Sequence, residues 1–272
     1  GKGRAMKNKK KSAALKAAYA RIGDIDVHAI RQMYAVYCQY YENTSWDIFL
    51  HDLSKKTGAF IMRNPSGRVV GFSTVMTTDI MVNGAPVRGV FSGDTIIERA
   101  YWGSRALQFA FYRFMIAEKA RHPLRKIYWF LISKGFKTYL LLANNFFSFY
   151  PRPDGEDEHL ADIVDAYCEQ MFPAHYDRER RILDFGADYQ PLRGDVAEIT
   201  DRMCEESEAI RFFQERNPEW RRGTELPCVG VFGWSDMAKY SLRYATKPAS
   251  KGRSDAHRQS GVVVKLRSAV GS

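Results

Sequence analysis

An acidic residue inside a strand-like segment is the first feature of this sequence that could do chemistry. Asp94 follows Phe91, Ser92 and Gly93 and precedes Thr95. A carboxylate among apolar neighbours is costly to bury as an anion, so burial should raise its pKa and let it accept a proton near neutral pH. We predict that Asp94 accepts a proton or anchors an amine; the structural alternative is a hydrogen bond to a nearby loop.

Directly after this strand pattern, the sequence predicts a tight turn and a long helix. Residues 101–105 interrupt the apolar pattern, and Ser104 can cap a helix that runs to Lys119. The first N–H groups of a helix have no partner within the helix, and they attract anions such as phosphates. The junction therefore predicts an anion site made by Trp102, Gly103, Ser104 and Arg105.

Length and composition indicate a globular protein. The chain has 272 residues, of which 45% are hydrophobic and 14% aromatic, so it can bury a sizeable core. No apolar run approaches the roughly 18 residues that span a bilayer, and the basic N-terminus is too weakly apolar for a signal peptide. Cys38, Cys168, Cys204 and Cys228 are far apart and form neither a disulfide framework nor a zinc pattern. We expect a cytoplasmic protein with reduced thiols and no metal.

The net charge of +10 is concentrated in the two terminal segments. Residues 1–21 contain eight Lys or Arg and no acid, and residues 247–272 contain six against the single acid Asp255. The part between them is slightly acidic, whereas nucleic-acid binding requires a basic surface on the folded domain. The charge pattern therefore argues against a nucleic-acid partner.

Apolar periodicity and turn signals predict the order of the elements. Before the junction we expect helices over 27–41 and 46–56 and strands over 59–63, 69–82 and 86–97, with Asn83 and Gly84 as a hairpin turn. After it we expect a buried strand over 126–132, helices over 136–149, 159–171 and 194–216, and a strand over 227–232. Because a helix separates the strands ending at 97 and beginning at 126, they should be parallel.

This pattern divides the chain into three parts. Residues 1–23 form a flexible basic arm, residues 24–246 a single domain with a core at 25–150 and an extension at 151–246, and residues 247–272 a disordered basic tail. We expect removal of residues 1–21 and 248–272 to leave folding unchanged, because these segments carry charge and few apolar residues.

The order of elements, with an anion site after the third strand, resembles the GNAT acyltransferase superfamily over residues 25–150. The resemblance implies a mixed α/β (α+β) fold, in which a splayed sheet is flanked by helices, here with additional C-terminal helices. In that family the pantetheine arm of the acyl donor lies between two parallel strands that part. It implies that Thr95, Ile96 and Ile97 face the pantetheine and that residues 102–105 hold the pyrophosphate.

The turn departs from the family's pattern Q/R-x-x-G-x-G/A. Whichever register is chosen, Gly103 and Arg105 do not both match, and Arg105 falls where a small residue belongs. Two donors stay open: acyl-CoA or acetyl-CoA, with the charge of Arg105 replacing backbone contacts, or the acyl-phosphopantetheine of an acidic acyl carrier protein, which presents one phosphate.

The resemblance implies an N-acyltransferase in which an amine of a small-molecule acceptor attacks the thioester directly. Asp94 is then the candidate base, with Glu98 as the second choice, and Tyr139 is the candidate acid, with core packing as its alternative. The other class of function is a catalytically silent GNAT-like scaffold for binding or regulation. The degenerate turn favours the scaffold, and the mid-strand Asp94 favours the enzyme.

Overall fold

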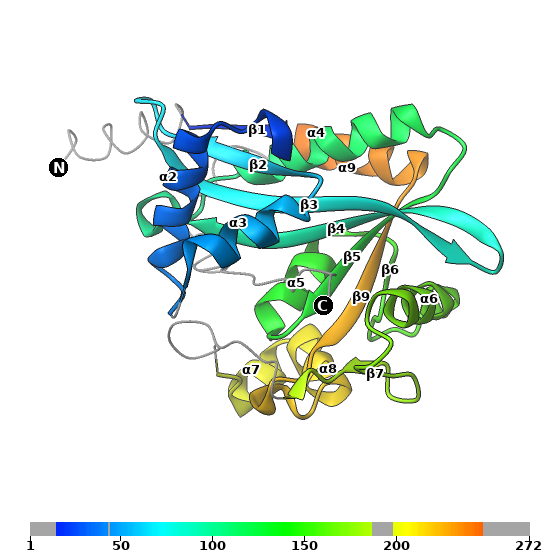
Figure 1. The fold of residues 1–272 in the computed structure, drawn as a ribbon. Coiled ribbons are helices and arrows are strands. Elements are labelled where there is room, and N and C mark those ends of the chain that lie inside the picture. Colours follow the sequence, from blue (N-terminus) through cyan, green and yellow to red (C-terminus); the bar gives the residue numbers. More distant parts are fainter. Residues whose placement is uncertain (1–14, 43, 187–197, 247–272) are drawn as a thin grey trace.

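The computed structural model describes residues 15–42, 44–186 and 198–246; the side chains of residues 94, 240, 241 and 243–246 lie outside this description. The strands are β1 (Lys16–Arg21), β2 (Gly58–Arg63), β3 (Val69–Val82), β4 (Ala85–Ile97), β5 (Ile127–Ser133), β6 (Phe149–Tyr150), β7 (Tyr176–Asp177), β8 (Ile182–Leu183) and β9 (Leu226–Phe232). Seven of them form one sheet in the order β1-β2-β3-β4-β5-β9-β6, and β7 and β8 form a separate hairpin (Figure 1).

Helices cover both faces of this sheet (Figure 1). They are α2 (Val27–Cys38), α3 (Trp46–Ser54), α4 (Ala106–Arg121), α5 (Phe136–Asn145), α6 (Ala161–Met171), α7 (Asp201–Glu206), α8 (Glu208–Arg216) and α9 (Trp234–Thr246). In the described part of the chain, no helix combines the length and the apolar character needed to cross a membrane.

The hairpin of β3 and β4 confirms the strongest local signal in the sequence. Asn83 and Gly84 have φ angles of 49° and 79°, the left-handed values that a two-residue turn between twisted antiparallel strands requires. The turn fixes the register, in which Val82 faces Ala85 and Asp79 faces Arg88. β3 begins and ends where the sequence predicts it.

Two apolar clusters hold the helices against the sheet. In one, Met33 of α2 and Phe49 of α3 pack with Phe72 and Ile96 of the sheet. In the other, Phe114 of α4 meets Phe60 edge-on, with ring centroids 5.4 Å apart. Burial of such side chains stabilises the fold by about 1.5–3 kcal/mol each. The pairing of β4 and β5 is parallel, as predicted, so the mixed splayed sheet flanked by helices is confirmed.

The extension after residue 150 is part of the central sheet. β9 runs antiparallel to β5 along its whole length, from Ile127 with Phe232 to Ser133 with Leu226. The sequence predicts this strand but not its partner. Residues 194–197 of the helix predicted over 194–216 lie outside the described residues. The rest contains two helices, because Ser207 ends α7 and its side chain accepts the N–H of Ile210 to begin α8.

The expectation of a flexible arm over residues 1–23 is wrong for its second half. β1 pairs antiparallel with β2, from Lys16 with Arg63 to Arg21 with Gly58. Its Tyr19 ring lies 4.8 Å from the Phe114 ring, and Arg113 donates to the carbonyl of Ala17 at 3.1 Å. The sequence does not predict this strand, because an edge strand with several alanines and a basic residue at each end lacks a clear alternation of apolar and polar residues. The tail at 247–272 lies outside the described residues.

Removing residues 1–21 should therefore destabilise the protein, contrary to the expectation from sequence. The deletion exposes Phe60 and Phe114 and leaves β2 with an unpaired edge, so we expect the melting temperature to fall by about 5–10 °C. Deletion of residues 1–13, which keeps β1, is the matched control and should melt like the parent. Equal melting temperatures for both deletions in a thermal scan would show that β1 contributes no stability.

Candidate functional site

Strands β4 and β5 pair over only part of their length. Parallel partners run from Arg88 with Ile127 to Phe91 with Phe130. Beyond them, Ser92 and residues 95–97 of β4 have their strand partners in β3, and residues 131–133 of β5 have theirs in β9. The two strands therefore part after Phe91 and Phe130, at the place the GNAT resemblance implies. Just past this point, Trp129 Nε1 donates to Ser92 Oγ at 2.5 Å.

A β-bulge in β4 lies where the strands part. Ser73 faces Thr95 and Val75 faces Ser92, so Thr74 stands opposite both Gly93 and Asp94. Gly93 is required by this contact, because a Cβ added there would lie 1.9 Å from Thr74 Oγ1. Thr74 is buried, and its hydroxyl oxygen has no hydrogen-bond partner in the described chain.

The bulge decides which backbone groups face the gap between the parted strands. The N–H of Glu98 donates to the carbonyl of Val70 at 2.9 Å. Since backbone groups alternate along a strand, those of Ile96 point to β3, and those of Thr95 and Ile97 point to the gap. By the same alternation, the Arg88 N–H bond to Lys126 places the backbone groups of Ile132 on the facing side of β5.

Two side chains donate hydrogen bonds to the carbonyl of Ile97. Tyr40 Oη donates to it at 2.9 Å and Trp102 Nε1 at 2.8 Å. Burial raises the pKa of Tyr40 above its ordinary value, so its hydroxyl is a donor at neutral pH. Along residues 95–97 of β4, this leaves the N–H and C=O of Thr95 and the N–H of Ile97 directed into the gap. Ile96 instead packs under α2 and α3.

The turn before α4 combines a glycine of positive φ with cationic side chains. Gly103 has a φ of 89°, which only glycine adopts readily. The predicted cap is one residue away from the true one: Arg105 is the N-cap, while Ser104 Oγ accepts the N–H of Ala106 at 3.2 Å. The Arg99 guanidinium lies 5.1 Å from the centre of the Trp102 ring. The first-turn N–H groups of α4 thus follow directly after the N-cap Arg105.

The structure separates the candidate acidic residues by their surroundings. The backbone of Asp94 lies in the bulge, and its side chain is outside the described residues. Glu98 is 15% exposed and accepts two hydrogen bonds from Arg68, at 2.6 and 3.1 Å. These bonds raise the pKa of Arg68 and occupy both Glu98 oxygens. Asp94 remains the first candidate for the base.

Tyr139, the candidate acid, lies in the core. Its side chain is fully buried, and its hydroxyl donates to the carbonyl of Pro151 at 2.8 Å. Burial raises its pKa well above the ordinary value. Its ring packs near Phe212 and Phe213 of α8. A buried hydroxyl that already donates its proton has no role at the gap, so this environment favours the packing alternative.

Sequence reasoning missed Thr74 and Tyr40. Thr74 carries no local signal, since it is one β-branched residue among many in β3, and only the register places it against Gly93. The glycine itself was a signal, because a glycine inside a strand often marks a bulge. Tyr40 follows α2 and meets Ile97 through a fold contact that crosses 57 positions.

Comparison with known proteins gives matches in structure alone. No family model matches the chain, and no curated protein matches it in sequence. A conserved Enterococcus faecalis protein described as a probable N-acyltransferase overlaps with 47% of this chain and 32% of its own, at 12% identity and a TM-score of 0.36. An Escherichia coli GNAT family N-acetyltransferase in complex with CoA overlaps with 43% and 63%, at 17% identity and a TM-score of 0.32.

A third solved structure is Saccharomyces cerevisiae N-myristoyltransferase with bound myristoyl-CoA. The overlap covers 56% of this chain and 39% of the yeast enzyme, at 10% identity and a TM-score of 0.33. This chain thus spans about a third of the first of these proteins and under two thirds of the second. At TM-scores of this size the overlaps carry no argument about activity or substrate.

Substituting Gly93 with alanine should disrupt the bulge. The added methyl group cannot coexist with Thr74 Oγ1, so we expect a loss of about 1–3 kcal/mol in the free energy of unfolding, measured by denaturant titration. Gly23→Ala, where nothing lies within 4 Å of the new methyl group, is the control.

The double variant Thr74→Ala with Gly93→Ala tests the cause of that loss. Removing Oγ1 leaves the Thr74 Cβ at 3.1 Å from the new methyl group, so part of the lost stability should return. If the double variant is less stable than the parent by the sum of the losses of the two single variants, the two residues do not interact.

Proposed function

We propose that this protein is an N-acyltransferase that takes an acyl group from a pantetheine thioester and transfers it to an amine. The observation that carries the proposal is the parting of β4 and β5 after Phe91 and Phe130, with the bulge at Gly93 and Asp94. A pantetheine arm is an extended chain with two amides. It can add to a strand edge as a peptide does, by backbone hydrogen bonds.

The backbone of Thr95 is the pairing partner for that arm. Its N–H and C=O face the gap, whereas the carbonyl of Ile97 is held by Tyr40 and Trp102. An N–H group at the bulge is also suited to polarise the thioester carbonyl and stabilise the oxyanion that forms on attack. The Ile96 side chain, buried under α2 and α3, contributes to the position of the strand and not to donor contacts.

The donor phosphate is assigned to the turn before α4. The positive end of a helix and a glycine with a positive φ suit an anion, and Arg99 and Arg105 add charge. Free acyl-CoA and carrier-bound acyl-phosphopantetheine share this phosphate chemistry. Acyl-CoA and the acyl carrier protein are therefore tested side by side, and an acidic carrier would bind in a salt-dependent way.

The reaction needs one bond formed and one broken. The amine nitrogen attacks the thioester carbon, the C–N bond forms, and the C–S bond breaks to release the thiolate. In the proposed mechanism Asp94 takes the proton from the attacking amine, and the thiolate takes a proton from solvent. We do not assign the acid to Tyr139, because its hydroxyl is buried and bonded to the carbonyl of Pro151.

Thiol release with a panel of acyl-CoA and acyl-carrier donors and of small amines tests this function. Acceptor-dependent release is the expected result. The alternative, a silent GNAT-like scaffold, is favoured by a turn that lacks the family's glycines. Donor binding in calorimetry without turnover of any amine would support the scaffold, and neither binding nor turnover would contradict both functions.

Replacing Asp94 with asparagine tests the base. The change keeps the size of the side chain but removes the charge that accepts a proton, so turnover should fall about 10²–10⁴-fold while donor binding stays intact. Ser92 is the matched neighbour: Ser92→Ala removes the acceptor of Trp129 and no charge. A folded Asp94→Asn protein with full activity would make Asp94 structural, and Glu98 would be tested next.

Replacing Arg105 with alanine tests the phosphate turn. Loss of one charge beside a phosphate should weaken donor binding by about 1.5–3 kcal/mol and affect the chemical step less. Arg121→Ala, an exposed arginine at the opposite end of the same helix, is the control. Calorimetric donor affinities equal to the parent's in both variants would mean that the phosphate lies elsewhere.

A further inference from the structure

A hollow lies at the β6 edge of the sheet, away from the parted strands. Its lining comes from Tyr150 of β6, from the loop between β7 and β8, from Glu158, and from the end of α8. Its volume is about 450 Å³, within the range of small-molecule sites. All of these residues belong to the described part of the chain.

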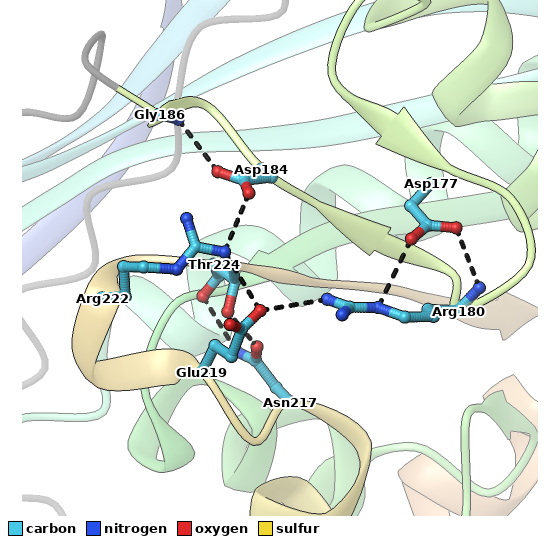
Figure 2. A network of polar contacts seen from close by, with 8 residues as sticks. All are labelled: Asp177, Arg180, Asp184, Gly186, Asn217, Glu219, Arg222 and Thr224. Atoms are coloured by element: carbon cyan, nitrogen blue, oxygen red, sulfur yellow. Dashed lines mark hydrogen bonds and ion pairs between the residues drawn. The ribbon is translucent and has the colours of Figure 1, made fainter.

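A network of ion pairs holds Arg180, one of the residues that line the hollow (Figure 2). Arg180, at the tip of the β7 and β8 hairpin, contacts Asp177 at 3.3 Å and Glu219 at 3.2 Å. Arg222 joins Glu219 to Asp184, at 3.0 and 2.9 Å. The hairpin is thereby tied to the segment between α8 and β9. These contacts lower the pKa of Asp184 and of Glu219, so both carboxylates stay charged and keep their ion pairs at neutral pH.

A second arginine of the hollow is also engaged. Arg181 binds both oxygens of the buried Asp165, each at 3.2 Å. The same carboxylate accepts the hydroxyl of Tyr176. Arg181 adopts a φ of 50° to make this contact, which a residue with a side chain seldom does without compensating bonds. Arg180 and Arg181 are thus structural.

Arg216 differs from these two arginines. Its guanidinium lies 5.8 Å from the ring centres of both Tyr150 and Phe212, and among the described residues no carboxylate lies within ion-pair distance. Aromatic rings hold the planar group in position but do not neutralise it. A partly buried guanidinium with its fork unused is suited to bind a carboxylate with two parallel hydrogen bonds.

Tyr150 lies beside Arg216, whose guanidinium is 5.8 Å from the centre of the Tyr150 ring. The residue is 2% exposed and lines the hollow. A tyrosine hydroxyl that opens on a hollow can donate a hydrogen bond to an acceptor atom of a ligand bound there. Arg216 and Tyr150 therefore present two neighbouring donor groups to the hollow, and we call these two residues its floor.

The rim of the hollow has the opposite character. Glu158, Glu179 and Glu215 are exposed, and in the described chain none of them is in an ion pair. These exposed carboxylates line the same hollow as Arg216 and Tyr150. Such an arrangement is complementary to a ligand with a negative group that enters first and a positive group that stays at the rim.

We propose that this hollow binds a free amino acid. The ligand carboxylate lies on Arg216 and the Tyr150 hydroxyl, and its ammonium group lies among the glutamates of the rim. The site does not depend on the proposed acyltransferase activity, because none of its residues contacts the gap between β4 and β5. Binding can therefore be measured whether or not the protein turns over a thioester.

Calorimetric titration of the full chain with the common free amino acids tests the proposal. We expect at least one of them to bind at a ratio of 1:1. The N-acetyl form lacks the ammonium, and the amide form lacks the carboxylate. The affinity of each should be lower than that of the free amino acid by a factor of about ten or more. An N-acetyl form that binds as tightly as the free amino acid would overturn the assignment of a zwitterion.

Two variants separate the floor from the rest of the surface. Tyr150→Phe removes a single hydroxyl and keeps the ring under Arg216, and it should weaken binding about tenfold. Arg216→Gln removes the charge and should weaken binding about tenfold to a hundredfold. Arg221→Gln is the control, because Arg221 is exposed and pairs with Glu198 at 2.8 Å.

Melting curves decide whether each variant is folded, and Arg216→Lys replaces Arg216→Gln if the latter is not. The proposal fails if no amino acid binds the parent protein at concentrations up to about 10 mM, a limit that corresponds to very weak affinity. It also fails if folded Tyr150→Phe and Arg216→Gln bind as tightly as Arg221→Gln.

Discussion

The contact between the Thr74 side chain and the backbone of Gly93 is the constraint on which the candidate site depends. It lies at the bulge, where two residues of β4 stand opposite one of β3, and this extra residue reverses the direction in which the following backbone groups point. Without it, Ile96 would direct its N–H and C=O toward the gap, and Thr95 would direct them toward β3. The bulge therefore converts an ordinary strand into one whose free edge can receive a ligand.

Two strands can part in this way because their outer edges are held. Buried backbone groups that lose a partner are costly, and β4 and β5 lose theirs after Phe91 and Phe130. β3 keeps pairing with β4 up to Ile97, and β9 keeps pairing with β5 up to Ser133. The C-terminal extension is thus part of what keeps the gap open, since β9 comes from the far end of the chain.

The sequence predicts the elements with strong local signals and misses those that depend on distant partners. Asn83 and Gly84 predict the hairpin, and the apolar run after Lys126 predicts β5, because both signals are local. β1 was missed, since the burial of Ala17 and Tyr19 depends on α4 and β2. At the site, the position of Asp94 in a strand could be predicted. The bulge could not be predicted, because it becomes visible only in the register of β3 with β4, which places Thr74 opposite both Gly93 and Asp94.

One row of strand pairing connects the parted strands with the hollow at the β6 edge. Phe91 pairs with Phe130, Phe130 with Val229, and Val229 with Tyr150. Adjacent strands lie about 4.8 Å apart, so this row separates Tyr150 from Phe91 by about 14 Å. The side chains of the two regions do not meet, yet the same backbone bonds position both. A substitution in the core of β9 should thus affect both regions, whereas a change at Arg216 or at Thr74 should affect its own region alone.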